Sequence, residues 1–357
     1  MEKTKIMQNA FMILLIFVPL TLFAEYMHFS PIGIFILASL AIIPLAKFIG
    51  ESTEEISAHT GPALGGFLNA TFGNATELII SIFALQAGLT DMVKASITGS
   101  IIGNLLLILG MALFLGGLGK DQQEFNTTAA RTNASTLFLA TAAIVMPVVF
   151  VLTSDNPSPA LVETLSIAVS VIMAVSYLAS LLFSLYTHKH LYTADTGECE
   201  VCIARWTVKK SLVILFASTI AVAVMSEILV GSIEPLAESL GWTELFIGMI
   251  FVAIIGNAAE HVSAITIAMK GRMDLSLQIA IGSTTQIAMF VVPVLVFVSY
   301  FFETPMNLIF TTFELACIVA SVLIVKSIIE DGKSNWFEGL QLLGTYGIMV
   351  VVSFLHP

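Results

Sequence analysis

The sequence contains few charged residues. Of its 357 residues, 11% are charged and 57% are hydrophobic, whereas ordinary soluble domains carry roughly a quarter charged residues. A soluble protein is therefore excluded. The hydrophobic residues form long runs, and about 20 such residues cross a bilayer as one helix, so we expect an all-α membrane protein with many spans. Examples of these runs are Ile32–Ala46, Leu137–Leu152, Leu161–Leu185 and Ala288–Phe302.

Other absences narrow the function. The three cysteines, Cys199, Cys202 and Cys317, do not make a disulfide framework. No series of about 10-residue alternating segments indicates an outer-membrane barrel, and no HExxH motif or nucleophile–base pair indicates a hydrolase. We expect no enzyme activity, no cofactor and no nucleic-acid partner. The formal net charge of −11 lies mostly in short loops and says little about partners.

Hydropathy predicts eleven membrane-spanning helices separated by short breaks. The first apolar segment follows Lys3 and Lys5 but lacks a small-residue cleavage site and is long enough to span, so we interpret it as a helix rather than a signal peptide. The predicted spans are residues 8–28, 31–49, 62–88, 91–118, 133–153, 158–187, 208–230, 242–269, 273–301, 305–328 and 335–355.

The basic residues predict the orientation. With the N-terminus inside, every lysine and arginine except Lys94 lies on the cytoplasmic side, where positively charged loops remain. The outward connections Thr153–Pro159, Gly231–Glu244 and Glu303–Asn307 carry no basic residue. The odd number of spans places the C-terminus outside. Short loops and the absence of targeting extensions favour a prokaryotic plasma membrane.

The chain contains an ungapped internal repeat. Gly73–Glu77 (GNATE) recurs as Gly256–Glu260 (GNAAE), with the offset of 183 residues that separates Glu77 from Glu260. One register held over about fifty residues is not expected by chance. The same offset pairs Glu51 with Glu234, Glu55 with Glu238, Gly65 with Gly248, Gly88 with Gly271, Asp91 with Asp274, Gly99 with Gly282 and Ser100 with Ser283.

The two copies enter the membrane from opposite sides because five crossings separate the third and eighth spans. Inverted repeats of this kind are typical of secondary transporters, whose substrate site lies near the midplane. We predict an N-terminal helix outside the repeat (1–29), a first five-helix repeat (30–187), a cytoplasmic linker (188–207) and a second, inverted five-helix repeat (208–357).

Glu77 and Glu260 are the strongest candidate site residues. Each lies near the middle of an apolar span, where a carboxylate costs several kcal/mol and usually serves a function. A protonated glutamate hydrogen-bonded between helices is the structural alternative. Glycine and asparagine before each glutamate (Gly73 and Asn74, Gly256 and Asn257) favour a local break that frees backbone carbonyls.

These groups form an all-oxygen site with a formal charge of −2. Such a site suits a hard divalent cation, and Ca²⁺ accepts six to eight flexible oxygen ligands more readily than Mg²⁺ does. No intramembrane cysteine pair or histidine cluster indicates a thiophilic metal. The same carboxylates can bind protons, so proton and metal are expected to compete.

A second set of polar residues lies at repeat-related depth in the fourth and ninth spans. Ser100, Asn104, Ser283 and Gln286 can orient the carboxylates, bind the ion or relay protons, while neighbouring glycines allow close helix contact. His261 either tunes proton affinity or hydrogen-bonds a carbonyl. Acidic residues near span ends form either solvated helix ends or a vestibule that gathers cations; they are Glu51, Glu54, Glu55, Glu227, Glu234 and Glu238.

The linker contains a weaker candidate. His188, His190, Cys199 and Cys202 include a CxxC pair, which either binds a metal such as zinc or is inert.

The motifs resemble those of the calcium/proton exchanger family within the cation/calcium exchanger superfamily. The resemblance rests on GNATELIISIFAL at Gly73–Leu85, GNAAEHVSAITIA at Gly256–Ala268 and GSTTQIAMFVVPVLV at Gly282–Val296. It implies an eleven-helix fold with Glu77 and Glu260 as the carriers of Ca²⁺ and protons. The long N-terminal tail of plant members and the acidic loop between spans six and seven are missing.

The expected function is secondary antiport that exports Ca²⁺ in exchange for H⁺ by alternating access. A Na⁺/Ca²⁺ exchanger, another divalent cation/proton antiporter and a passive cation channel are the alternatives. A Na⁺/Ca²⁺ exchanger would need further oxygen-rich sites, and a channel has no need for inverted copies of a binding turn.

The orientation is testable with a membrane-impermeant thiol label. In a variant without Cys199, Cys202 and Cys317, we predict that cysteines placed at Ser158 or Glu303 react in intact cells. A cysteine at Gly332 should react only after permeabilisation, because its loop is cytoplasmic. The reverse pattern would contradict both the orientation and the inverted repeat.

Overall fold

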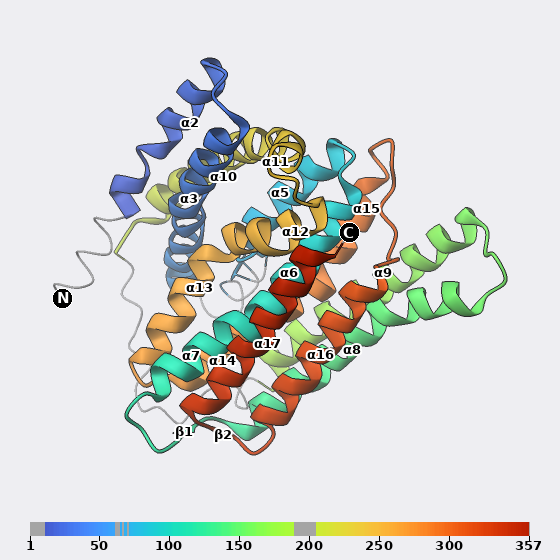
Figure 1. Cartoon of the computed structure of the whole chain (residues 1–357). Coiled ribbons are helices and arrows are strands. Elements are labelled where there is room, and N and C mark those ends of the chain that lie inside the picture. Colours follow the sequence, from blue (N-terminus) through green and yellow to red (C-terminus); the bar gives the residue numbers. More distant parts are fainter. Residues whose placement is uncertain (1–10, 61–64, 66–67, 70, 189–204, 357) are drawn as a thin grey trace.

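The protein is a bundle of helices (Figure 1). The computed structural model describes residues 11–60, 65, 68–69, 71–188 and 205–356. Its elements in the first half are α2 (Phe17–Tyr26), α3 (Pro31–Thr60), α5 (Ala75–Gln86), α6 (Thr90–Ile102), η1 (Gly103–Ile108), α7 (Leu109–Gly117), β1 (Gln123–Glu124), α8 (Thr127–Thr153), α9 (Pro159–Leu182) and η2 (Phe183–Thr187).

The second half continues with the same kinds of element. They are α10 (Val208–Gly231), α11 (Ile233–Leu240), α12 (Glu244–Phe246), η4 (Ile247–Val252), α13 (Ala253–Met269), α14 (Met273–Gln286), η5 (Ile287–Val291), α15 (Val292–Ser299), α16 (Thr312–Ile329), β2 (Lys333–Ser334) and α17 (Trp336–Leu355).

The all-helical membrane architecture is confirmed. Nine helices in the described part of the chain are long and apolar enough to cross a membrane. Two shorter apolar helices, Phe11–Tyr26 and Ala75–Gln86, lie within the predicted first and third spans. The antiparallel pair of β1 and β2, which joins two loops at the lower end of Figure 1, was not predicted.

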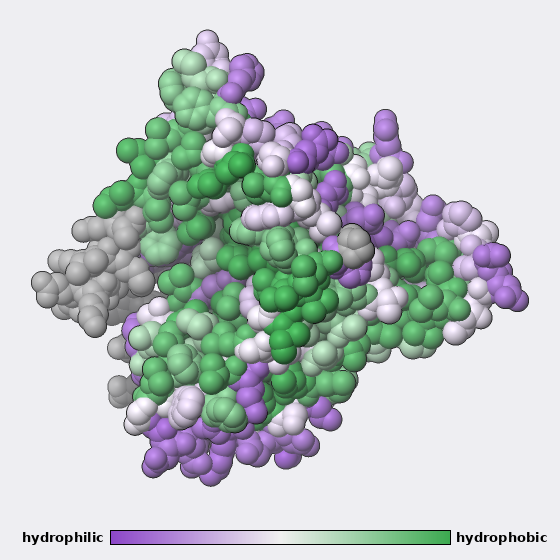
Figure 2. All heavy atoms as spheres, viewed as in Figure 1, coloured by the Kyte–Doolittle hydropathy of each residue, from purple (hydrophilic) through white to green (hydrophobic). Residues whose placement is uncertain are grey.

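The outer surface agrees with a bilayer environment. Figure 2 shows hydrophobic residues over the middle of the molecule and hydrophilic residues gathered at its lower end and along its upper and right edges. Large apolar side chains such as Phe216, Ile172 and Ile348 are exposed on helices α10, α9 and α17. In water such a surface would be unfavourable, whereas lipid chains cover it at no cost.

Several helix ends differ from the expectation. Helix α3 runs to Thr60 and therefore includes Glu51 and Glu55, which we expected near a span end at residue 49. The predicted connection Gly231–Glu244 contains helix α11, whose Ile233 and Leu236 side chains are buried. These two apolar residues lie three positions apart and form one face that packs against the bundle. The hydropathy pass, which detects long apolar spans, did not predict so short a helix.

Three π-helical segments interrupt the helices closest to the repeated motifs. Segment η1 follows α6, η5 follows α14, and η4 precedes α13. π-helical turns are rare and occur frequently at functional sites. Asn104 lies in η1, and Gln286 is the last residue before η5.

The expected helix break occurs in only one of the two motifs. Helix α5 begins at Ala75, after Asn74 with φ −101° and ψ 24°. Helix α13, by contrast, runs continuously through Gly256 and Asn257, so the break predicted there is wrong. Its irregularity lies one turn earlier, in η4.

Close backbone contact joins α6 to η4. A Cβ atom added to Gly99 would collide with the Met249 backbone, and one added to Gly248 would lie 2.7 Å from the Met92 carbonyl oxygen. Only glycine permits this approach, as expected for small residues between membrane helices. The contact brings the polar residues of α6 and η1 next to the second motif.

Lys94, the one basic residue assigned to the outer side, is an internal structural cation. Its Nζ atom donates to Asn307 Oδ1 and to the Ile309 carbonyl oxygen, both at 3.0 Å, and lies 3.9 Å from Asp91 Oδ1. These groups form hydrogen bonds with the Lys94 ammonium inside the bundle, so Lys94 does not lie in an exposed loop. Its side chain joins α6 to the segment before α16.

Candidate functional site

The two motif glutamates each lie against the glycine of the opposite motif. A Cβ atom added to Gly256 would be 2.7 Å from Cγ and 3.2 Å from Cδ of Glu77. One added to Gly73 would be 3.3 Å from Oε1 of Glu260. The glycines therefore leave the space that the carboxylates occupy, and α5 and α13 bring the two halves of the chain together at one place.

Asn74 of the first motif bonds to residues of α14. Its Nδ2 donates to Gln286 Oε1 at 2.7 Å, and its Oδ1 accepts from Ser283 Oγ at 3.1 Å. The serine and the glutamine lie one helical turn apart, so both face the same side of α14.

Asn257 of the second motif bonds in a corresponding way to α6 and η1. Its Nδ2 donates to Ser100 Oγ at 3.0 Å and to the Ala253 carbonyl oxygen at 2.9 Å, and Asn104 Nδ2 donates to its Oδ1 at 3.4 Å. Ser100 and Ser283 occupy equivalent repeat positions. Each asparagine thus contacts one serine and one amide side chain from the opposite half.

Asn104 links this network to His261. Asn104 Nδ2 also donates to Ser283 Oγ at 3.0 Å, and its Oδ1 lies 3.2 Å from Nε2 of the buried His261. Because an amide oxygen only accepts, the proton in this hydrogen bond is on His261 Nε2. We expected His261 either to tune proton affinity or to hydrogen-bond a carbonyl. The hydrogen bond that it makes is to the side-chain amide oxygen of Asn104, not to a backbone carbonyl.

One oxygen of each glutamate carboxylate is buried without a donor. Glu77 Oε1 and Glu260 Oε2 have no hydrogen-bond partner among the described residues. The Asn257 amide lies beside the Glu77 carboxylate, and the Ser283 hydroxyl beside that of Glu260. An ionised carboxylate in an apolar interior is costly unless it is paired. A proton or a bound cation removes that cost.

A cavity of about 530 Å³ reaches this site from one end of the bundle. Gly73, Glu260, Ser283 and Gln286 line it, and Glu77, which is 6% exposed, does not. The exposed residues Glu54, Arg205 and Lys270 lie at its mouth, together with the less exposed Lys47 and Glu51. The basic residues mark the end that the sequence assigns to the cytoplasm.

A family of known proteins matches both halves of the chain. The family is described as "Sodium/calcium exchanger protein", and residues 30–186 and 210–355 match it. The chain belongs to this family. The match confirms the family resemblance that rests on the GNAxE motifs.

Relatives of this exchanger cover nearly its whole length. A "Ca(2+)/H(+) antiporter" from Aphanothece halophytica is 49% identical over 364 residues, covering 96% of each chain. "Ca(2+)/H(+) antiporter ChaA" from Bacillus subtilis is 50% identical over 343 residues, covering 95% of this chain and 96% of that one. The solved structure of native YfkE has a TM-score of 0.84 at 47% identity and covers 97% and 99% of the two chains.

The acidic residues expected to form a vestibule are not together in the exchanger. Glu51 lines the large cavity, where its Oε1 is 3.6 Å from Lys47 Nζ. Glu55 is buried at 6% exposure and bonds to Arg205 and Trp206, so it does not face the cavity. No sequence pattern indicated this contact, because Arg205 lies far from α3 along the chain.

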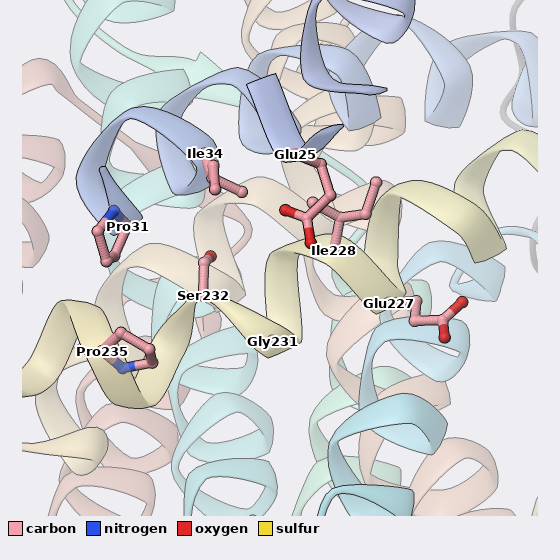
Figure 3. A pocket seen from close by; sticks show the side chains of 8 residues that line it. All are labelled: Glu25, Pro31, Ile34, Glu227, Ile228, Gly231, Ser232 and Pro235. Carbon is pink, nitrogen blue, oxygen red and sulfur yellow. The ribbon is translucent and has the colours of Figure 1, made fainter. Parts of the chain in front are cut away.

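The remaining acidic residues lie at the other end of the bundle. Glu234 and Glu238 are exposed on α11. Glu227 lines a second cavity of about 300 Å³ between α2, α3 and α10, together with Glu25 (Figure 3). Figure 3 shows Glu25 pointing toward Ile228, whereas the Glu227 carboxylate points away from it. The two carboxylates point in different directions in this view.

The linker hypothesis concerns residues that are mostly outside the described part. His190, Cys199 and Cys202 fall there, while the His188 ring stacks on Phe183 at 4.1 Å between centroids. Among the described residues, no group of three or more histidine, cysteine, aspartate or glutamate side chains is placed to hold a metal ion.

The glycine contacts lead to a stability prediction. Gly256→Ala should lower the free energy of unfolding by about 1–3 kcal/mol, because the new Cβ overpacks against Glu77. Gly344→Ala in α17 is the matched control, since a Cβ there meets nothing within 4 Å, and it should not destabilise the protein. Thermal unfolding of the detergent-purified variants measures both, and equal stability of the two variants would show that Glu77 does not fill the space at Gly256.

Proposed function

We propose that this exchanger is a Ca²⁺/H⁺ antiporter that exports Ca²⁺ from the cytoplasm by alternating access. The observation that supports this function is the pair of buried carboxylates, each with one oxygen that no donor of the described residues reaches. A buried carboxylate needs a proton or a cation, and either ligand can be exchanged for the other. Two bacterial relatives that are 49% and 50% identical to this chain are named Ca²⁺/H⁺ antiporters, which agrees with Ca²⁺ and H⁺ as the two substrates.

The ligand chemistry favours Ca²⁺ as the transported cation. Glu77 and Glu260 supply two carboxylates, and Asn74 and Asn257 supply amide oxygens. Each amide oxygen accepts one hydrogen bond and retains a second lone pair for a cation. Near Gly73 the Asn69 carbonyl oxygen also approaches the same space as Glu260 Oε1. Oxygen ligands of mixed type suit a flexible Ca²⁺ shell.

The charge of the site supplies the coupling. Two ionised glutamates balance one Ca²⁺, and two protonated glutamates are neutral without it. Both loaded forms therefore carry no net charge through the apolar interior, while the empty ionised form carries −2 and is disfavoured. This difference permits exchange and prevents uncoupled leak.

The polar residues around the carboxylates have supporting roles in this proposal. Ser100 and Asn104 position Asn257, while Ser283 and Gln286 position Asn74. His261 orients Asn104 and thereby couples the two motifs. Substitution at these positions is expected to alter affinity more than to remove the exchange reaction, because the carboxylates remain.

The proposed architecture has eleven spans, with an N-terminal helix (1–29), inverted repeats (30–187 and 208–357) and a cytoplasmic linker (188–207). The separate family matches to 30–186 and 210–355 support this division. With the N-terminus in the cytoplasm and the C-terminus outside, in a bacterial plasma membrane, the cavity that contains Glu260 opens inward. The outward-facing form would then expose Glu77 instead.

The direct test uses purified protein in proteoliposomes. An imposed pH gradient should drive ⁴⁵Ca²⁺ uptake that saturates and reverses with the gradient. An equal Na⁺ gradient without a pH gradient should drive none. Uptake with Na⁺ alone would identify a Na⁺/Ca²⁺ exchanger, and flux that neither saturates nor couples to pH would identify a channel.

The same assay tests the site residues. Glu77→Gln and Glu260→Gln should each abolish exchange, because one carboxylate cannot balance Ca²⁺ and an amide releases no proton. Asn74→Ala and Asn257→Ala should reduce exchange less, since water can replace a neutral oxygen ligand. Near wild-type exchange by either glutamine variant would contradict the two-carboxylate mechanism.

A further inference from the structure

Among the described residues, the mouth of the large cavity carries more basic than acidic side chains. Three basic residues lie there with two acidic ones, whereas the third acidic lining residue, Glu260, lies at the inner end of the cavity. A vestibule that gathers cations would instead show an excess of carboxylates. The charged residues that line the cavity are Lys47, Arg205, Lys270, Glu51, Glu54 and Glu260.

Arg205 is fixed at this mouth by Glu55, which does not line the cavity. Glu55 Oε2 accepts from the backbone nitrogens of Arg205 at 2.7 Å and Trp206 at 2.9 Å, and Oε1 accepts from Arg205 Nε at 3.1 Å. His59 Nε2 lies 2.8 Å from the Trp206 carbonyl oxygen. Two residues of α3 therefore hold the chain that leads into α10.

The two charges of this ion pair are unequally exposed. The Arg205 side chain is 63% exposed and the Glu55 side chain 7%. The guanidinium lines the cavity, whereas the carboxylate lies behind it. An ion that enters the cavity consequently meets the positive member of the pair first, while the negative member acts from inside the protein.

We propose that Arg205, positioned by Glu55, limits the concentration of Ca²⁺ at the cavity mouth and so sets the apparent Ca²⁺ affinity from this side. This inference rests on the proposed transport of Ca²⁺. A guanidinium at the mouth repels a divalent cation, and low-dielectric cavity walls strengthen that field. For a unit charge about 10 Å from a divalent ion in water, Coulomb's law gives a change in local ion concentration of about fourfold.

The electrostatic account predicts opposite effects for the two partners. Arg205→Gln leaves the Glu55 charge unbalanced and should tighten apparent Ca²⁺ binding by about fourfold at low salt. Glu55→Gln leaves the guanidinium unbalanced and should weaken binding by a similar factor. The double variant should lie between the two single variants and bind somewhat more tightly than the wild type, because the exposed guanidinium lies nearer the entering ion than the buried carboxylate does. All shifts should nearly disappear in about 1 M KCl, where the screening length falls to about 3 Å.

A purely structural clamp gives a different pattern. Loss of either partner would then shift binding in the same direction, the double variant would not recover, and salt would not remove the change. Any of these results would overturn the inference. Lys209→Gln is the matched control, because Lys209 is exposed on the neighbouring turn and is not among the residues that line the cavity, and its shift should be smaller than that of Arg205→Gln.

Two readouts separate this inference from the proposed function. Equilibrium ⁴⁵Ca²⁺ binding to the purified variants measures the charge effect without transport. Uptake driven by a pH gradient in proteoliposomes measures antiport in the wild type. Absence of the opposed binding shifts would overturn the role of Arg205, whereas absence of pH-driven uptake by the wild type would overturn Ca²⁺/H⁺ antiport.

Discussion

A carboxylate buried between apolar helices needs a neutralising ligand, and this protein has two at one place. Glu77 and Glu260 lie in motifs from the two halves of the chain, and each occupies the space left by the glycine of the other motif. Among the residues that the structure describes, no lysine or arginine forms an ion pair with either carboxylate. In the proposed mechanism, a proton or Ca²⁺ neutralises these carboxylates in turn, which is the exchange that an antiporter requires.

The hydrogen bonds around the carboxylates join the two halves of the chain and leave some oxygen atoms of the site without a hydrogen bond. Asn74 bonds to Ser283 and Gln286, and Asn257 bonds to Ser100 and Asn104. Each asparagine keeps one acceptor lone pair, and among the described residues no donor reaches one oxygen of each glutamate. In the proposed mechanism, the network positions these side chains in advance and leaves their oxygens able to bind an ion. Only Glu260 lines the open cavity, so the two carboxylates are unequal in this conformation.

The sequence predicted much of this arrangement because its repeat preserves spacing. The shared offset identified Glu77 with Glu260 and Ser100 with Ser283, and the apolar runs identified the helical membrane fold. The sequence did not reveal which polar groups pair across the halves, because those contacts join residues 150 or more positions apart. Helix continuity at Asn257 also escaped prediction: α13 runs through Gly256 and Asn257, and the Asn257 side chain bonds to the Ala253 carbonyl oxygen one turn earlier.

The sequence also did not predict the different surroundings of the acidic residues near the cavity mouth. Glu51 and Glu55 look alike in the sequence, yet Glu51 lines the cavity and Glu55 binds the loop at Arg205. Acidic residues four positions apart on one helix can have different neighbours when a distant loop packs against one of them. Hydropathy and repeat spacing do not encode the position of that loop, whereas the three hydrogen bonds accepted by Glu55 define it.

In the proposed mechanism, protons and Ca²⁺ compete for the same two carboxylates. The most direct measurement is calorimetric Ca²⁺ titration of the purified protein in buffers of different ionisation enthalpy, which gives the number of protons released per ion bound. Because the carboxylates titrate as a pair, the count is expected to vary with pH and to approach about two when both begin protonated. A count near zero across the whole pH range would contradict the shared site.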